Sequence, residues 1–146
     1  MERPLYPAAI HLFFRKNGEI LLLRRFNTGY EDGNYSVVAG HIEPGESATQ
    51  AGIREAKEEV GVRIDPRNLK IHGIMHRYSN GERIDFFAFV DTWEGEVSNM
   101  EPNKCDRLLW AHKECLPQNT IPYIRRALRL SDGQIWYDES GWEEIS

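Results

Sequence analysis

Residues 40–62 read GHIEPGESATQAGIREAKEEVGV, and this stretch decides the fold of the central part of the chain. Ser47 followed three residues later by Gln50 is typical of a capping box, in which two side chains satisfy free backbone N–H groups at the start of a helix. The helix is predicted to run to about Val60. Gly61, directly after it, can adopt the left-handed conformation that ends many helices.

Three carboxylates lie on one side of this predicted helix. Glu55, Glu58 and Glu59 occupy positions i, i+3 and i+4, so their side chains project together. Such like charges repel each other, and a hard divalent cation between them would remove the repulsion. Mg²⁺ favours oxygen ligands and is typically held by a few carboxylates together with substrate phosphates. A merely solvated, charge-rich helix face is the alternative explanation.

The flanking residues favour the metal-binding interpretation. Gly40 and Glu46 precede the glutamates, and Gly61 follows them, at the spacing of the Nudix box, which residues 40–62 resemble in full. This signature is typical of hydrolases that cleave nucleoside diphosphates linked to another moiety. The resemblance implies an enzyme with an α/β fold, a Nudix-type α/β/α sandwich with a mixed β-sheet. It also implies Mg²⁺ as cofactor, with Mn²⁺ as a substitute.

The resemblance also assigns roles inside the box. The catalytic residues that it implies are Arg54, Glu55, Glu58 and Glu59. The three glutamates bind the metal ions in this family, and the backbone carbonyl of Gly40 commonly completes the shell. Arg54 orients a box glutamate, with Glu46 as its expected partner, a task that suits a planar and permanently charged group. Glu55 is the leading candidate for both ligand and general base, with Glu59 as the alternative base.

Outside the box the chain resembles MutT-type nucleoside triphosphate pyrophosphohydrolases. Their Trp-Glu-Gly-Glu segment precedes a glutamate that binds metal, and residues 93–96 lead here to Glu101. Arg25 matches an arginine that contacts phosphate. Asn119 matches an asparagine that recognises a purine, although it would equally suit a helix cap.

Two further positions concern the substrate. MutT-type enzymes usually carry an aromatic-Pro-Gly sequence before the box glycine, whereas residues 37–39 are Val-Val-Ala. Val37 would retain the apolar floor of a base pocket without the ring contact. Tyr78 lies where some dinucleoside polyphosphate hydrolases carry a base-stacking tyrosine, but a strand tyrosine more often serves packing.

The remaining chain predicts a mixed sheet covered by helices. Asn17-Gly18 between two apolar runs is typical of a β-hairpin, and Ser79-Asn80-Gly81 predicts another. Strands are expected at residues 8–14, 20–25, 69–78, 83–93 and 107–112, and a second helix at residues 120–130. A short segment at residues 36–38 follows the polar loop at residues 26–34. Residues 1–146 are expected to form a single domain. Residues 131–146 form an aromatic and acidic tail, expected to be a strap over apolar surface, with a lid or dimer contact as alternatives.

Composition narrows the partners. A formal charge of −5 for 146 residues disfavours a nucleic-acid surface, which needs clustered Lys and Arg. No segment is long enough to span a membrane, and no signal peptide is recognised, so a cytoplasmic monomer or homodimer is expected. The two cysteines, Cys105 and Cys115, do not have zinc-site spacing and are expected to be reduced.

The sequence therefore predicts a nucleotide as small-molecule substrate. The favoured reaction converts a nucleoside triphosphate, ribo or deoxy, to a monophosphate and pyrophosphate. Hydrolysis of a dinucleoside polyphosphate or of ADP-ribose is the alternative within the family. A non-catalytic, nucleotide-binding Nudix module is the alternative outside enzymes.

Overall fold

The computed structural model describes residues 2–145, which form a mixed sheet with one helix on each face. The two helices are α1 (Ala48–Val60) and α2 (Pro122–Leu130). The strands are β1 (Ala8–Lys16), β2 (Glu19–Arg25), β3 (Tyr35–Ser36), β4 (Val38–His41), β5 (Leu69–Tyr78), β6 (Glu82–Val90), β7 (Cys105–His112) and β8 (Trp136–Ser140). Short 3₁₀ helices cover Pro66–Asn68, Lys113–Cys115 and Trp142–Ile145.

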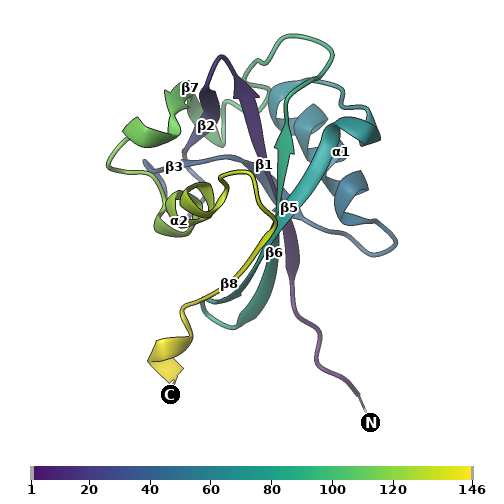
Figure 1. The fold of residues 1–146 in the computed structure, drawn as a ribbon, viewed down its shortest axis with the longest axis vertical. Helices are drawn as coiled ribbons and strands as arrows, with labels where there is room; N and C mark the ends of the chain where they lie inside the picture. The colour runs from purple at the N-terminus through teal and green to yellow at the C-terminus, as the bar shows by residue number, and fades with distance from the viewer. Residues whose placement is uncertain (1, 146) are drawn as a thin grey trace.

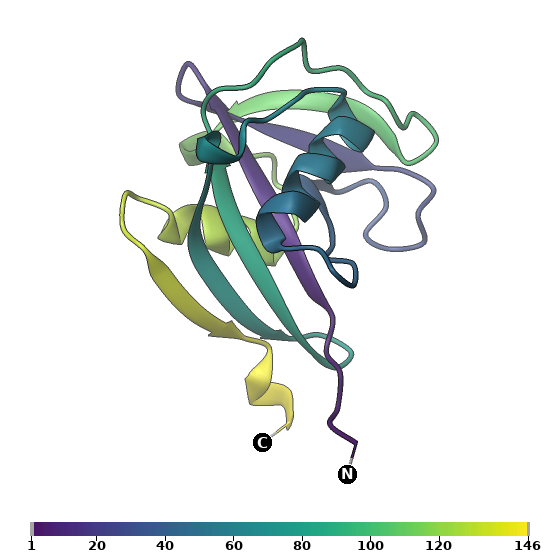
Figure 2. The same ribbon diagram turned by 90° about the vertical axis from the view of Figure 1, so that its right-hand side faces the viewer.

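The sheet follows the order β3-β2-β1-β6-β5-β8, with β4 paired to β1 and β7 paired to β2. β1 and β6 run parallel, as do β5 and β8, and the other pairs are antiparallel. Figure 1 shows α1 and α2 on opposite sides of the central strands, and Figure 2 shows α1 crossing in front of them. The predicted α/β/α arrangement with a mixed sheet is confirmed.

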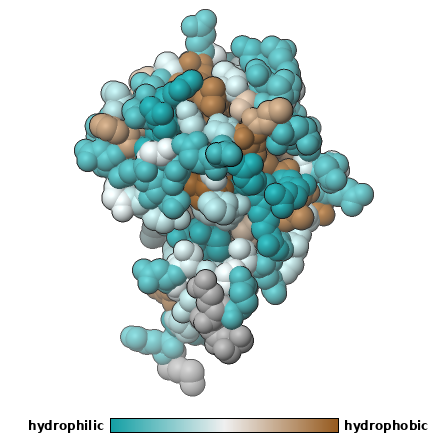
Figure 3. All heavy atoms as spheres, turned by 90° about the vertical axis from the view of Figure 1, so that its left-hand side faces the viewer, coloured by the Kyte–Doolittle hydropathy of each residue, from teal (hydrophilic) through white to brown (hydrophobic). Residues whose placement is uncertain are grey.

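Two hydrophobic cores, one on each face of the sheet, hold the layers together. Along β1, Ile10 and Leu12 join the core under α1, whereas Phe13 joins the core under α2, as expected where successive side chains point to opposite faces. Small residues of α1, including Ala51 and Ala56, are fully buried against the sheet. The face on the α2 side is largely hydrophilic, with separate small hydrophobic patches (Figure 3). Within residues 2–145 no helix is long and apolar enough to cross a membrane.

The predicted hairpin turn at Asn17-Gly18 forms with both residues at positive φ, but its strands pair over only two residues each. β2 then diverges to pair with β7, and β1 continues beside β4 and β6. The short segment at residues 36–38 belongs to two short strands, β3 and β4. The second helix starts at residue 122 rather than 120, with Pro122 in its first turn, where a missing N–H costs nothing.

The C-terminal tail contributes a strand that the sequence did not predict. β8 pairs with β5 in parallel, and Trp136 packs directly over Gly73, where a Cβ atom would lie 2.1 Å from the indole. Trp136 also packs against the core under α2. The strap interpretation of the tail is therefore correct for Trp136, and its backbone completes the sheet as well.

Candidate active site

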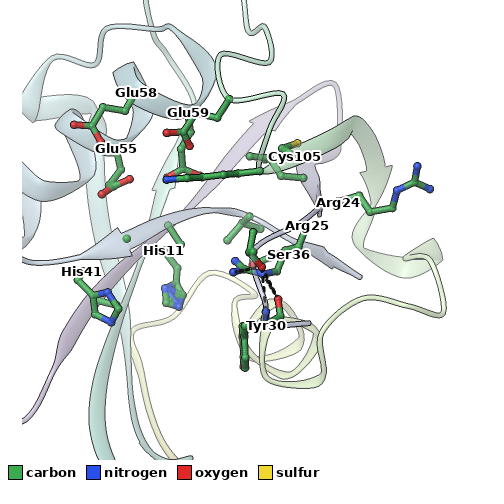
Figure 4. Close-up of a pocket in the computed structure, with 18 of the residues that line it drawn as sticks. His11, Arg24, Arg25, Tyr30, Ser36, His41, Glu55, Glu58, Glu59 and Cys105 are labelled. Atoms are coloured by element: carbon green, nitrogen blue, oxygen red, sulfur yellow. Dashed lines mark hydrogen bonds between the residues drawn. The ribbon is translucent and has the colours of Figure 1, made fainter. Parts of the chain in front are cut away.

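A cavity of about 630 Å³ opens between α1, β4, β2 and the segment that precedes β7. Figure 4 shows Glu55, Glu58 and Glu59 on one side of this cavity and His11 with Tyr30 on the other. The predicted site residues that line it are Arg25, Val37, Gly40, Glu55, Glu58, Glu59 and Glu101. Most of the predicted site therefore converges on one concave surface.

Local sequence positions the glutamates of α1. The capping box forms as predicted: Ser47 Oγ accepts from the Gln50 N–H at 3.1 Å, and the Ser47 N–H donates to Gln50 Oε1 at 2.8 Å. Gly61 ends the helix at φ 74°, in the left-handed region. With both ends of the helix fixed and its small residues buried against the sheet, Glu55, Glu58 and Glu59 line one side of the cavity.

Arg54 organises the carboxylates beneath the cavity. It forms a two-bond ion pair with Glu46, with Nε to Oε2 at 2.8 Å and Nη2 to Oε1 at 3.0 Å. Its Nη1 donates to Glu55 at 2.7 Å and to Glu58 at 3.3 Å, and its Nη2 donates to the carbonyl of His41. The hydrogen bonds from Arg54 hold the pKa of Glu46 down to about 2. Arg54 thus ties the loop, β4 and α1 into one unit, and the expected pair with Glu46 is confirmed.

Gly40 permits β4 to approach the helix. A Cβ atom at this position would lie 2.2 Å from Cδ and Oε1 of Glu55, far inside van der Waals contact. The absence of a side chain therefore fixes where the Glu55 carboxylate lies. It also leaves the backbone of β4 exposed to the cavity at the point where the glutamates converge.

Glu101 reaches the same place through backbone hydrogen bonds. The Ser98 N–H donates to the carbonyl of Val60 at 3.0 Å, and the Met100 N–H donates to the carbonyl of Glu59 at 3.1 Å. These bonds use the carbonyls left free at the C-terminus of α1. The segment that carries Glu101 is therefore docked on the end of the helix that carries the other glutamates.

The crowding of carboxylates has an electrostatic consequence. Burial, a hydrogen bond with Glu55 and the charges of Glu55 and Glu101 together raise the pKa of Glu59 well above its ordinary value. Glu59 Oε2 is buried and has no hydrogen-bond partner among the described residues. A cation beside Glu59 would remove both costs, so the donor set fits a hard metal ion.

The carboxylates are not a preassembled metal cage. Within residues 2–145 no three His, Cys, Asp or Glu side chains are arranged as a complete metal site. Arg54 accounts for part of this arrangement, since it occupies oxygens of Glu55 and Glu58. A metal ion at this point would have to compete with the guanidinium for the oxygens of Glu55 and Glu58.

Arg25 lies at the end of β2 and is held by the loop that follows it. Its Nε donates to the carbonyl of Tyr30 at 2.6 Å, and its Nη2 donates to Thr28 Oγ1 at 3.1 Å. Asp32 closes this loop by accepting from Thr28 and from the Gly29 N–H. The loop thus presents Arg25, Thr28 and Tyr30 to the cavity as one folded unit.

Two predicted substrate contacts lie outside the cavity lining. The ring of Tyr78 packs near that of Trp142, with centroids 5.5 Å apart. Its neighbour Arg77 lines the cavity instead, because adjacent strand residues face opposite sides of the sheet. The geometry therefore gives no support to the stacking role predicted for Tyr78.

Asn119 also points elsewhere. Its side-chain amide donates to the carbonyl of Gly33 at 2.7 Å, and its own carbonyl accepts from the Tyr35 N–H at 2.8 Å. It does not cap α2, whose N-cap residue is Ile121, without a side-chain bond. In this geometry Asn119 fastens the loop before β3 to the segment before α2, and its amide does not reach the cavity.

The far end of the cavity contains polar residues that the sequence reasoning missed. His11, Arg77, Arg83 and Tyr123 line it, and the fully buried Asp85 lies behind them. The sequence did contain a signal for them. Arg83, Asp85 and Phe87 are each two residues apart on β6, so two charged side chains lie on the same face of the strand as a core aromatic.

Comparison with known proteins identifies the family. The NUDIX domain model matches residues 4–129. The chain is 28% identical over 125 residues to an 8-oxo-dGTP diphosphatase of Escherichia coli K12, which covers 84% of this chain and 95% of that protein. It is 48% identical over 114 residues to an NAD-capped RNA hydrolase NudC of Stutzerimonas stutzeri A1501, which covers 77% of this chain. The chain spans only 38% of the length of that NudC.

A solved structure agrees on the fold. The MutT NUDIX hydrolase from Burkholderia pseudomallei superposes with a TM-score of 0.80 at 21% identity, over 88% of this chain and 99% of that one. The chain belongs to the Nudix family. It is a pyrophosphohydrolase of the MutT-like type, and the Nudix family generally uses divalent metal ions.

Proposed function

We propose that this enzyme hydrolyses a phosphoanhydride bond of a nucleoside triphosphate, releasing a nucleoside monophosphate and pyrophosphate, with Mg²⁺ or Mn²⁺ as cofactor. The observation that carries the proposal is the meeting of Glu55, Glu59 and Glu101, two from α1 and one from the segment docked on its end. Three carboxylates on one side of the cavity would repel the substrate's phosphates without a cation. With cations present, the same carboxylates become the phosphate-binding site.

The residues that line the cavity have separate proposed roles in binding metal, activating water and binding phosphate. Glu55, Glu58, Glu59 and Glu101, with the carbonyl of Gly40, would hold the metal ions. When bound, divalent ions neutralise phosphate oxygens and lower the pKa of a water. Glu55 is the base that we assign to the proton of the attacking water, with Glu59 as the alternative. Arg54 holds Glu55 in place, and Arg25 at the cavity mouth is suited to the phosphates that extend from the metal site.

Val37 is the apolar contact that we assign to the nucleoside. It is buried to 3% exposure in the core under α2 and lines the cavity. It provides apolar area without the directional preference of an aromatic ring. We therefore expect tolerance between bases rather than strict selection of one modified purine.

The decisive experiment is a screen of nucleoside triphosphates with Mg²⁺, with Mn²⁺ and with chelator, on the wild type and two variants. Glu58→Gln should remove most of the turnover while circular dichroism shows an intact fold, because an amide has a similar shape but binds a hard cation weakly. Glu101→Gln should lower turnover at least tenfold, with Glu96→Gln as the matched control, since Glu96 does not line the cavity.

Full activity of folded Glu58→Gln would exclude the metal assignment. Equal, small effects at Glu101 and Glu96 would show that Glu101 is only a surface charge. Release of a nucleoside diphosphate and phosphate, instead of a monophosphate and pyrophosphate, would place the attack at a different phosphorus.

A dinucleotide or nucleoside diphosphate derivative is the second candidate. The observation that favours it is the second polar end of the cavity, which offers a binding surface beyond the phosphates. Adding diadenosine polyphosphates, NAD and ADP-ribose to the same screen ranks the two candidates by kcat/KM.

A further inference from the structure

The end of the cavity opposite the glutamates holds a cluster of charged side chains that the proposed chemistry does not use. We define it as the arginine cluster, comprising His11, Arg77, Arg83, Asp85 and Tyr123. The strand pattern brings these residues together: Arg77 pairs in register with Arg83, and Arg83 and Asp85 are two residues apart on one face of β6. Tyr123 of α2 covers them, with its ring 3.6 Å from the centre of the Arg77 guanidinium.

The charges of the arginine cluster do not balance. Asp85 is fully buried, and its Oδ2 accepts from Arg77 Nε at 2.9 Å. Its Oδ1 lies 3.7 Å from Arg83 Nε and 3.5 Å from His11 Nε2, too far to satisfy either donor. Arg83 Nε and Asp85 Oδ1 are both buried without a hydrogen-bond partner among the described residues. Two guanidinium groups thus share one carboxylate.

His11 and Tyr123 are uncharged at pH 7 and do not neutralise the excess positive charge of the arginine cluster. Burial lowers the pKa of His11 to about 4, so the imidazole is uncharged at pH 7, and burial raises the pKa of Tyr123 to about 12. Of the residues that line the same cavity, the carboxylates are Glu43 and the four glutamates of the proposed metal site. His41, Arg24, Arg25 and Lys104 also line the cavity but do not belong to the cluster. The arginine cluster therefore carries one excess positive charge.

Incompletely paired charges in a largely buried cluster are unfavourable for folding alone, since replacing such groups with apolar residues often stabilises a protein. Arg77 is 6% exposed, yet it lines the cavity together with Arg83, His11 and Tyr123. His11 and Tyr123 are hydrogen-bonded to each other, so the guanidinium groups of Arg77 and Arg83 supply the donors for whatever fills the cavity. Planar guanidinium groups bind phosphate and carboxylate with paired hydrogen bonds.

We propose that the arginine cluster binds an anionic group, a phosphate or a carboxylate, on the part of the substrate that extends away from the scissile phosphates. This inference rests on the metal site of the proposed function, at which those phosphates lie beside α1, and it favours the second candidate, a nucleoside diphosphate derivative, over a nucleoside triphosphate. The substrate is a nucleotide derivative with a second anion remote from its phosphoanhydride. Arg83, whose Nε lacks a partner, makes the principal contact, and Arg77 supports it.

Matched substrate pairs test the proposal through hydrolysis. In each pair the two substrates differ by one anionic group. ADP-ribose and ADP-ribose 2′-phosphate differ by a phosphate, and UDP-glucose and UDP-glucuronic acid differ by a carboxylate. The wild type should favour the anionic member of at least one pair by tenfold or more in kcat/KM. The pair that shows the preference identifies the anion as phosphate or carboxylate.

Variants assign the preference to the cluster. Arg83→Gln should lower kcat/KM at least tenfold more for the anionic member than for the neutral one, and Arg83→Lys should restore part of the preference because it retains the charge. Arg67→Gln is the matched control, since Arg67 is exposed, pairs with Asp65 and lies outside the cavity. A ratio near one in the wild type, or an equal loss for both members in Arg83→Gln, would overturn the proposal.

A binding measurement separates this proposal from the proposed function. Calorimetry without metal compares AMP with adenosine 2′,5′-bisphosphate, which adds only the second anion. The bisphosphate should bind at least tenfold more tightly to the wild type and lose that advantage in Arg83→Gln. Equal binding of the two probes, or binding of neither, refutes an anion site for phosphate. Absence of all hydrolysis would refute the proposed function and leave this comparison to decide the inference.

Discussion

Gly40→Ala should strongly lower turnover without unfolding the enzyme. The new Cβ would lie 2.2 Å from Cδ of Glu55, whereas carbon atoms at optimal separation are about 3.5–4.0 Å apart. The Glu55 carboxylate must therefore move by about 1.5 Å, or β4 must move away from α1. Moving the carboxylate costs less, because it is the end of a flexible side chain beside a cavity. A misplacement of about 1 Å in a catalytic group can cost about 100-fold in rate.

We expect kcat to fall about 100-fold, or about 2.7 kcal/mol in transition-state stabilisation. The free energy of unfolding should fall by no more than about 1–2 kcal/mol, the cost of losing the hydrogen bond from Arg54 to Glu55. Steady-state kinetics and urea unfolding measure the two quantities on the same preparation.

A double-mutant cycle tests the mechanism. If Gly40→Ala acts by displacing Glu55, it should have little further effect in the Glu55→Ala background. Since alanine retains the backbone carbonyl, the variant does not remove that candidate ligand. Full activity of Gly40→Ala would refute the steric argument, and an equal loss in both backgrounds would show that residue 40 acts independently of Glu55.

Three further outcomes follow from the geometry. Arg54→Lys should lower kcat at least tenfold, because an ammonium group cannot make the paired bonds to Glu46 and also hold Glu55; kinetics of the folded variant check this, and unchanged turnover would contradict it. His11 should make the free energy of unfolding fall as the pH falls. Its pKa is about 4 in the folded protein and about 6.5 in the unfolded chain, so the unfolded chain takes up a proton at higher pH. The free energy of unfolding should therefore fall by about 2 kcal/mol between pH 7 and pH 5. Urea unfolding at both pH values should show that His11→Gln removes this share, and an identical pH dependence in the variant would refute it. Asn119→Ala should raise KM for all bases alike by freeing the loop at Gly33, whereas altered base discrimination would restore Asn119 as a base-reading residue.

The parts of the structure that could be predicted from sequence depend on local interactions. The capping box at Ser47, the left-handed residue Gly61 and the helix between them involve neighbours in the chain, so residue type and spacing are sufficient. The glutamates follow from the helix period for the same reason. Glu101 could be placed only by family resemblance, because its approach to α1 depends on backbone bonds to the helix C-terminus.

The parts that could not be predicted depend on which face of a strand a residue takes. Tyr78 and Arg77 are adjacent, and a shift of one residue exchanges the side chain that reaches the cavity. β8 was not predicted because its parallel pairing with β5 joins distant parts of the chain. The hydrogen bond from Asn119 to Gly33 could not be predicted either, because Gly33 lies 86 residues away in sequence.

One end of the cavity has an excess of negative charge and the other an excess of positive charge. We therefore interpret both ends as binding sites rather than as contributions to the stability of the fold. At one end, burial and the neighbouring carboxylates raise the pKa of Glu59. At the other end, Arg83 lies close to a carboxylate that already accepts a hydrogen bond from Arg77. Neither arrangement strengthens the fold, since a buried charge without a full set of partners costs stability. Each becomes favourable when a complementary charge enters, cations at α1 and an anion at the arginine cluster. The strands between them hold the two ends apart at a fixed distance, so a ligand that satisfies both must carry its phosphoanhydride and its second anion on one molecule.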